Sequence, residues 1–280
     1  MMKTIVVIYN YNLPSETDEI YDKLISDGFD ENEIVIVDNG SDKNPKASST
    51  NFALPVNIRF TGQAYISLIY LLDFFEFDNF LLITTSAGLK SGINYKNEVM
   101  IINSKFKNKF GFVTASLSNG LTKTNAIEQS YEQMTDSYKK VFKYQPIVTL
   151  ISKELLECCR EKKAAYFNLN LKRGWGIDRE LQYIANTNGL ECYVSRDLSV
   201  NWNTNLAHKK GLADESQNKY HVAAESEMSI ELSRKYGPYW ESIFESAFYN
   251  KPIKPTFKNI IKNILVKSGV YKTYIKIFKR

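Results

Sequence analysis

The sequence predicts an α/β protein with a Rossmann-like, mostly parallel sheet flanked by helices and a basic, amphipathic helical appendage at the C-terminus. The first half alternates short apolar runs with helix-like segments, the pattern of a parallel sheet with crossover helices. Residues 79–85 are nearly all apolar, which suits a strand buried on both faces. With 280 residues, of which 44% are hydrophobic, the chain is long enough to bury one substantial core.

The expected elements follow one another from the N-terminus. A strand at 4–9 precedes a helix that begins near Pro14 and stops before Gly28, and the next strand ends in the turn Asp38-Asn39-Gly40-Ser41. Residues 117–144 lose periodicity and predict a loop. The later strands are expected at 33–37, 56–60, 79–85, 110–116 and 190–194, and the later helices at 64–75, 94–106, 152–161, 178–188 and 219–236.

The C-terminal residues differ from the rest in charge. Residues 251–280 contain eight Lys and one Arg and no acidic residue, and subtracting these nine from the 36 basic residues leaves 27 against 31 acidic ones. We therefore expect one domain over residues 1–250 and a basic tail over 251–280. Apolar residues recur in the tail at helical spacing, which is typical of a helix on an anionic membrane surface; packing on the protein's own body is the alternative. They are Phe257, Ile260, Ile261, Ile264 and Leu265.

The cysteines and the hydropathy indicate where the chain works. Cys158, Cys159 and Cys192 are odd in number and two are adjacent, so we expect reduced thiols. No secretory signal or apolar run of membrane-spanning length is recognised. A cytoplasmic protein, peripheral at the inner face of the plasma membrane, is the expectation. Nucleic acid is not an expected partner, because no nucleic-acid-binding module accompanies the lysines.

Polar side chains follow the first two expected strands. Tyr9 and Asn10 end the first, and Asp38, Asn39 and Ser41 follow the second. Ligands of open α/β sheets bind outside the carboxyl ends of strands, and a carboxylate there accepts hydrogen bonds from a base imide or a ribose hydroxyl. The alternative is that the Asp-Asn-Gly-Ser turn is selected only for its backbone geometry. No glycine-rich phosphate loop is present, which argues against a dinucleotide site.

Four segments together resemble the family 2 glycosyltransferases. VVIYNYN followed by EIVIVDNGSD is similar to the family's start, and IRFTGQAYISLIYLLDF, GWGIDRELQYIA and NLAHKKGLADES follow in the family's order, over residues 3–215. The resemblance implies a GT-A fold that binds a nucleotide-sugar donor. It also implies transfer with inversion to a cell-surface glycan or a lipid-linked acceptor.

The third of these segments provides the candidate catalytic base, Asp178. An inverting transfer needs a carboxylate that removes the proton of the acceptor hydroxyl. The turn before Asp178 contains Arg173 and Trp175, which are expected to contact the acceptor or a phosphate. The alternative is that Asp178 only favours a helix N-terminus and that Trp175 belongs to the core. Glu180, two positions on, is the weaker candidate.

The segment after residue 79 departs from the family, which usually carries an Asp-x-Asp there for Mg²⁺ or Mn²⁺. It reads LLITTSAGLKSG, with no Asp or Glu between Asp78 and Glu98, so the usual ligands of a hard cation are missing. We expect transfer without a metal cofactor, or else an inactive relative that binds a glycan or nucleotide sugar. Thr84, Thr85 and Ser86 are expected beside the ribose and phosphates. His208 and Lys209 are expected near the phosphates, where Lys90, Arg173 or Lys210 are further cations that could replace the metal's charge.

Overall fold

The computed structural model describes residues 2–107, 109–118, 127–163 and 166–253, together with Ile261 and Ile264. Its described strands form one sheet in the order β3-β2-β1-β4-β8-β6-β9-β5, and β7 also pairs with β9. The strands are β1 (Thr4–Asn10), β2 (Ile34–Asp38), β3 (Phe52–Ala53), β4 (Asn79–Thr84), β5 (Ala87–Leu89), β6 (Phe110–Leu117), β7 (Tyr138–Lys140), β8 (Val148–Ser152) and β9 (Glu191–Trp202).

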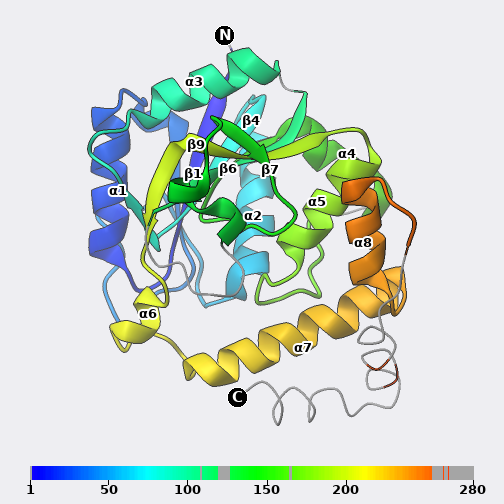
Figure 1. Ribbon diagram of the computed structural model, residues 1–280. Helices are drawn as coiled ribbons and strands as arrows, with labels where there is room; N and C mark the ends of the chain where they lie inside the picture. Colours follow the sequence, from blue (N-terminus) through cyan, green and yellow to red (C-terminus); the bar gives the residue numbers. More distant parts are fainter. Residues whose placement is uncertain are drawn as a thin grey trace.

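Helices lie around this sheet (Figure 1). The view shows α1 and α3 toward the left and top, and α4, α5 and α8 grouped on the right, with the long α7 across the bottom. The helices are α1 (Pro14–Ser26), α2 (Arg59–Phe74), α3 (Tyr95–Phe106), α4 (Lys153–Lys163), α5 (Ile177–Thr187), α6 (Leu206–Lys209), α7 (Gln217–Tyr236) and α8 (Trp240–Tyr249); short 3₁₀ turns lie at Glu31–Glu33, Ile127–Gln129 and Tyr131–Gln133.

The direction of the strands confirms the predicted fold class. β1 is parallel to β2 and β4, and β2 is parallel to β3. β8 is antiparallel to both β4 and β6, so β6 runs in the same direction as β4, and β9 is parallel to β6. Six of the nine described strands therefore point one way, and β5, β7 and β8 point the other way. The parallel strands end at one edge of the sheet, where ligands of α/β proteins bind.

Each face of the sheet carries its own hydrophobic core. Ile5 and Val7 of β1 pack in the core that α2 and α5 cover, whereas Val6 and Ile8 pack in the core that α1 and α3 cover. This alternation is the two-residue period of a strand. All four side chains are fully buried, and burying an aliphatic side chain contributes about 1.5–3 kcal/mol. The polar strand ends are thereby fixed on a rigid sheet.

The expected third strand at 56–60 is wrong. Arg59 already begins helix α2, and the short strand β3 lies earlier, at Phe52–Ala53. A short apolar run does not distinguish a strand from the start of a buried helix. The first backbone N–H groups are satisfied by asparagines, since Asn57 Oδ1 accepts from the Arg59 N–H at 2.8 Å and Asn39 Oδ1 accepts from the Ile58 N–H at 3.0 Å.

Sequence periodicity placed most of the other elements correctly but missed pairings made late in the chain. The expected strand at 190–194 extends to Trp202 as β9, because it pairs with β6 and also with β5 and β7. Strand β8 was not expected. The helix expected at 152–161 is observed as α4 and is capped by Ser152, whose Oγ accepts from the Leu155 N–H at 3.1 Å. The expected loop contains β7, and its residues 119–126 lie outside the described part.

Two other expectations concern the cysteines and the tail. All three cysteines are free thiols, and Cys159 and Cys192 are buried. No helix within the described residues is both long enough and apolar enough to cross a bilayer. Except for Ile261 and Ile264, both exposed, residues 254–280 lie outside the described part of the chain, so the membrane-surface helix stays a prediction.

Candidate functional site

A pocket of about 400 Å³ lies where the parallel strands end. Residues at or after the ends of β1, β2 and β4 line part of it. Asn57, just before α2, and Arg59, its first residue, also line it, and the segment around α6 contributes residues 205–208 and 213–215. The pocket thus lies where the sequence predicted a ligand. Eight of the predicted residues line it: Tyr9, Asn10, Asn39, Thr84, Thr85, Ser86, Arg173 and His208.

Asp38 and Ser41 are not among the residues that line the pocket and lie behind the lining residues Asn10 and Asn39. The Asp38 carboxylate is completely buried. Its Oδ2 accepts from Asn10 Nδ2 at 2.8 Å and from Ser41 Oγ at 2.6 Å, and its Oδ1 accepts from the Ser41 N–H at 2.8 Å. Both oxygens are thus used inside the protein. In this arrangement Asp38 holds the turn and orients Asn10, and direct contact with a donor stays a prediction.

Gly40 lets this turn pack against the chain that precedes α2. Its φ is +69°, and a Cβ atom built there would lie 2.3 Å from the backbone carbonyl carbon of Val56. No residue with a side chain fits at that distance. The Asp-Asn-Gly-Ser turn therefore fixes both the end of β2 and the start of α2, and it brings Asn39 and Arg59 to the same pocket.

The end of β4 offers hydroxyl groups and no carboxylate. Thr84 Oγ1 and Ser86 Oγ lie 2.8 Å apart, and the Thr84 N–H donates to Ile147 O at 2.9 Å. Among the described residues, no three His, Cys, Asp or Glu side chains are grouped so that they could hold a metal ion. Mg²⁺ and Mn²⁺ prefer carboxylate oxygens. The residues at this strand end therefore do not fit the divalent cation that the family pattern implies.

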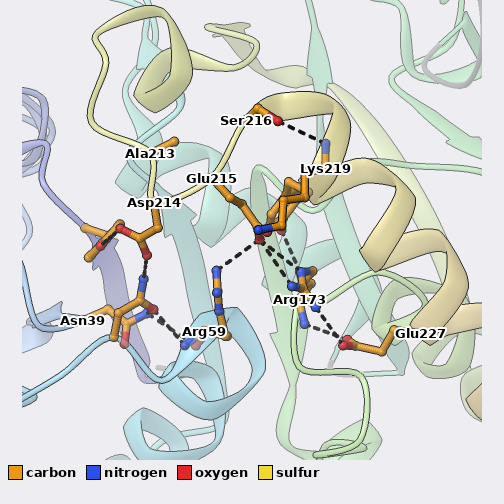
Figure 2. A network of polar contacts seen from close by, with 12 residues as sticks. Asn39, Arg59, Arg173, Ala213, Asp214, Glu215, Ser216, Lys219 and Glu227 are labelled. Carbon is orange, nitrogen blue, oxygen red and sulfur yellow. Dashed lines mark hydrogen bonds and ion pairs between the residues drawn. The ribbon is translucent and has the colours of Figure 1, made fainter. Parts of the chain in front are cut away.

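Arg59 and Arg173 bring positive charge to the pocket, and Figure 2 shows Glu215 between them. Arg59 Nη1 lies 3.5 Å from Glu215 Oε1, and Arg173 Nη2 lies 3.3 Å from the same oxygen. On its other side, Arg173 Nη1 lies 3.3 Å from Glu227 Oε2. Arg59 has a positive φ of 68°, which is rare for a residue with a side chain and directs the chain from the β2 turn into α2.

Asp214, the neighbour of Glu215, contacts the end of β1 from the same loop. Asp214 Oδ2 accepts from Asn57 Nδ2 at 3.0 Å, and Tyr11 donates a short hydrogen bond to Asp214 Oδ1. Burial, together with the Asp214 carboxylate, raises the pKa of Tyr11 to about 12, so its phenol stays a donor at neutral pH. The sequence analysis missed Tyr11, Asn57, Arg59, Asp214 and Glu215. The signal was present, because Asp214 and Glu215 belong to the resembling segment NLAHKKGLADES.

Asp178 lies in the first turn of α5 but is not among the pocket-lining residues. Its Oδ1 accepts from the Gly176 N–H at 3.2 Å, and its Oδ2 lies 3.9 Å from Arg179 Nε. The side chain is 18% exposed. Burial raises the pKa of Asp178, although Arg179 and backbone donors oppose that shift. A carboxylate with a raised pKa that is still partly exposed is suited to accept a proton.

The remaining predicted residues have different surroundings. Trp175 is 36% exposed, so the alternative that it belongs to the core is wrong, and its ring centroid lies 5.4 Å from that of His221. His221, which the sequence left without a role, lines the pocket, whereas Lys209 and Lys90 do not. Glu180 is buried and accepts from Lys235 Nζ at 2.9 Å and from Tyr236 Oη at 2.6 Å, which are structural contacts.

The fold is that of a GT-A-type glycosyltransferase. No family model and no curated protein sequence matches the chain, but solved structures do. S. aureus TarS 1–349 in complex with UDP-GlcNAc is similar with a TM-score of 0.58 and 12% identity over 96% of this chain and 80% of that one. TarS 1–349 in complex with UDP is similar with a TM-score of 0.56 and 12% identity, over 98% of this chain and 92% of that one. The mannosyltransferase PcManGT from Pyrobaculum calidifontis, in complex with GDP-Man and Mn²⁺, is similar with a TM-score of 0.54 and 10% identity, over 99% of this chain and 84% of that one.

Proposed function

We propose that this protein is an inverting glycosyltransferase that moves a sugar from a nucleotide-sugar donor to a cell-surface glycan or a lipid-linked acceptor. The observation that carries the proposal is the pocket at the carboxyl ends of β1, β2 and β4, lined by hydroxyls, amides and two arginines. This is the position where α/β sheets bind nucleotides. The similar solved structures with UDP, UDP-GlcNAc and GDP-Man support a donor of this class.

Each group of lining residues has a place in donor binding. Tyr9, Asn10 and Asn39 lie at or just beyond the ends of β1 and β2 and form the nucleoside side, with Asp38 and Ser41 fixing Asn10 from behind. The hydroxyls of Thr84, Thr85 and Ser86 hydrogen-bond the ribose and the phosphates. Arg173 and His208 face the phosphates, and the guanidinium charge together with the hydrogen-bond donors of both side chains takes the place of a metal held by carboxylates.

Asp178 is the proposed general base. It accepts the proton of the acceptor hydroxyl while the oxygen attacks the anomeric carbon and the bond to the diphosphate breaks, so the leaving group departs with the electron pair and the configuration inverts. The raised pKa of Asp178 brings it closer to the pH at which it works. Trp175, partly exposed beside the pocket-lining His221, offers an indole face to the acceptor sugar.

The basic tail is the proposed contact with an anionic membrane, which places the enzyme in the cytoplasm, peripheral at the inner face of the plasma membrane. Each basic residue near anionic lipid contributes about 1 kcal/mol, and residues 251–280 hold nine with no acid. Flotation with vesicles containing anionic lipid tests this. The full chain is expected to float and a chain ending at residue 250 to stay behind; equal flotation of both chains rules out the tail as anchor.

A second candidate is a non-catalytic protein that binds a glycan or a nucleotide sugar, favoured by the hydroxyl-only end of β4. A thermal-shift screen of UDP, GDP, dTDP and CMP sugars, with and without Mn²⁺, first identifies the donor. Transfer is then measured in EDTA. Turnover that survives chelation and is lost in Asp178→Ala supports the enzyme. Donor binding without any turnover, with and without metal, supports the binding protein.

A further inference from the structure

Two arginines that line the pocket share one oxygen of a single carboxylate. Arg59 reaches Glu215 Oε1 from Nη1 at 3.5 Å, and Arg173 reaches the same atom from Nε at 3.4 Å and from Nη2 at 3.3 Å. All three contacts are longer than the roughly 2.7–2.9 Å of a good charge-assisted hydrogen bond. A planar guanidinium binds best to two oxygens side by side. Glu215 is therefore a poor partner for this pair.

The two arginines differ in how firmly they are held. Glu227 of α7 accepts from the Arg173 backbone N–H at 2.8 Å and lies 3.3 Å from its Nη1, so Arg173 keeps a carboxylate partner when Glu215 moves. Within the described residues, Glu215 is the single carboxylate that pairs with Arg59. If Glu215 leaves, the pair gains one net positive charge on the pocket wall.

The loop that carries Glu215, residues 203–216, has little buried side-chain surface. None of residues 203–216 is fully buried or packs against either hydrophobic core, although Trp202 just before the loop does. Asp214 is held by Tyr11 and Asn57, and the backbone oxygen of Ala213 accepts from Lys43 Nζ at 2.7 Å. Segments with little buried apolar surface open at low free-energy cost. Glu215 is thus able to give up its place without disturbing the sheet.

We infer that Arg59 and Arg173 form the diphosphate subsite of the pocket and that Glu215 is its internal counterion, which the diphosphate of a nucleotide sugar displaces. This inference rests on the proposed function. A diphosphate offers both guanidinium groups paired oxygens and carries more negative charge than one carboxylate, and it repels Glu215 from the shared position. Arg59, which the sequence did not single out, thereby becomes a donor-binding residue.

The test measures binding of inorganic pyrophosphate in EDTA by titration calorimetry, with folding of each variant checked by thermal melting. Glu215→Gln keeps the shape of the side chain and removes its charge, so we expect about tenfold tighter binding, which corresponds to about 1.4 kcal/mol. Arg59→Gln and Arg173→Gln are each expected to weaken binding about tenfold or more. The control is Glu191→Gln, which removes a carboxylate paired with Lys140 at the other end of β9 and is expected to bind like the unchanged chain.

The outcomes separate this inference from the proposed function. Equal or weaker binding of pyrophosphate by Glu215→Gln overturns the counterion, and unchanged binding by Arg59→Gln overturns the subsite. If Arg173→Gln fails to fold, Arg59→Gln decides alone. If Glu215→Gln binds pyrophosphate more tightly but the unchanged chain has no transferase activity, the inferred subsite stands and the proposed function is overturned. If the chain transfers sugar but these variants bind pyrophosphate as the unchanged chain does, the proposed function stands and the subsite is overturned.

Discussion

The turn around Asp38 and the start of α5 around Asp178 both present an aspartate, but in opposite states. Asp38 is fully buried, and both its oxygens accept hydrogen bonds from Asn10 and Ser41. Asp178 is 18% exposed, accepts from the Gly176 N–H at 3.2 Å and lies 3.9 Å from Arg179 Nε, and burial raises its pKa although backbone donors oppose that shift. A fully buried carboxylate whose two oxygens are both hydrogen-bonded holds structure, whereas a partly exposed one with a raised pKa is available for chemistry. Variants at the two positions should therefore fail in different ways.

The largest expected effect is on the rate of transfer in Asp178→Asn. Losing a general base slows the chemical step by about 10²–10⁴-fold. Because burial disfavours the charged form of Asp178, the melting temperature at neutral pH should stay equal or rise. Transfer assays and thermal melting check both parts. A fall in stability with the rate retained would reverse the assignment of the two aspartates.

Asp38→Ala is expected to lower the free energy of unfolding by about 3 kcal/mol or more. Three hydrogen-bond donors lose their buried acceptor, and each unsatisfied donor costs about 1–3 kcal/mol. Urea unfolding followed by circular dichroism measures the loss. Stability close to that of the unchanged chain, together with lost donor binding, would mean that Asp38 contacts the donor directly and that its internal hydrogen bonds contribute little.

Gly40→Ala sharpens the structural side of the comparison. The added methyl group would meet the Val56 backbone at 2.3 Å, whereas Gly189, also at positive φ, has no atom within 4 Å of its added Cβ. Both alanine variants share the backbone strain, so their difference isolates the close approach. We expect Gly40→Ala to be less stable than Gly189→Ala by about 1–3 kcal/mol, the usual cost of overpacking. Equal unfolding midpoints in urea would show that the turn shifts freely away from α2.

The smallest expected effect is on pH dependence. The pKa of Asp178 is raised in the folded protein, so the base loses its proton above the ordinary pKa of an aspartate. The value of kcat/KM should therefore rise with pH through this raised pKa. The stability of the folded state runs the other way: the contribution of protonated Asp178 is complete below the unfolded pKa and is lost as pH rises through the folded one. Asp178→Asn should therefore gain stability over the unchanged chain only above this range. A pH series of melting curves and rates checks it.

Prediction from the sequence worked best where a segment carries its own signal. Helix α3 was expected at 94–106 and is observed at Tyr95–Phe106, with Asn94 Oδ1 accepting from the Asn97 N–H at 2.8 Å. β8 was missed although Val148–Ser152 is an apolar, β-branched run, because so short a run does not distinguish a strand from the start of a buried helix. The start of α2 was misassigned, because the asparagines that satisfy its first N–H groups include Asn39, which is distant in sequence.

The candidate site divides in the same way. The sequence alone determined that polar side chains follow the ends of β1, β2 and β4, since strand ends are set by local hydrophobic pattern and all parallel strands end at one edge. It also determined that no carboxylate follows β4. Only the tertiary structure decided that Asp38 is buried behind the wall and that Arg59 and Arg173, 114 positions apart in the chain, meet at Glu215. Ion pairs between distant segments leave no periodic trace in a sequence, because they depend on how helices and loops pack around the sheet.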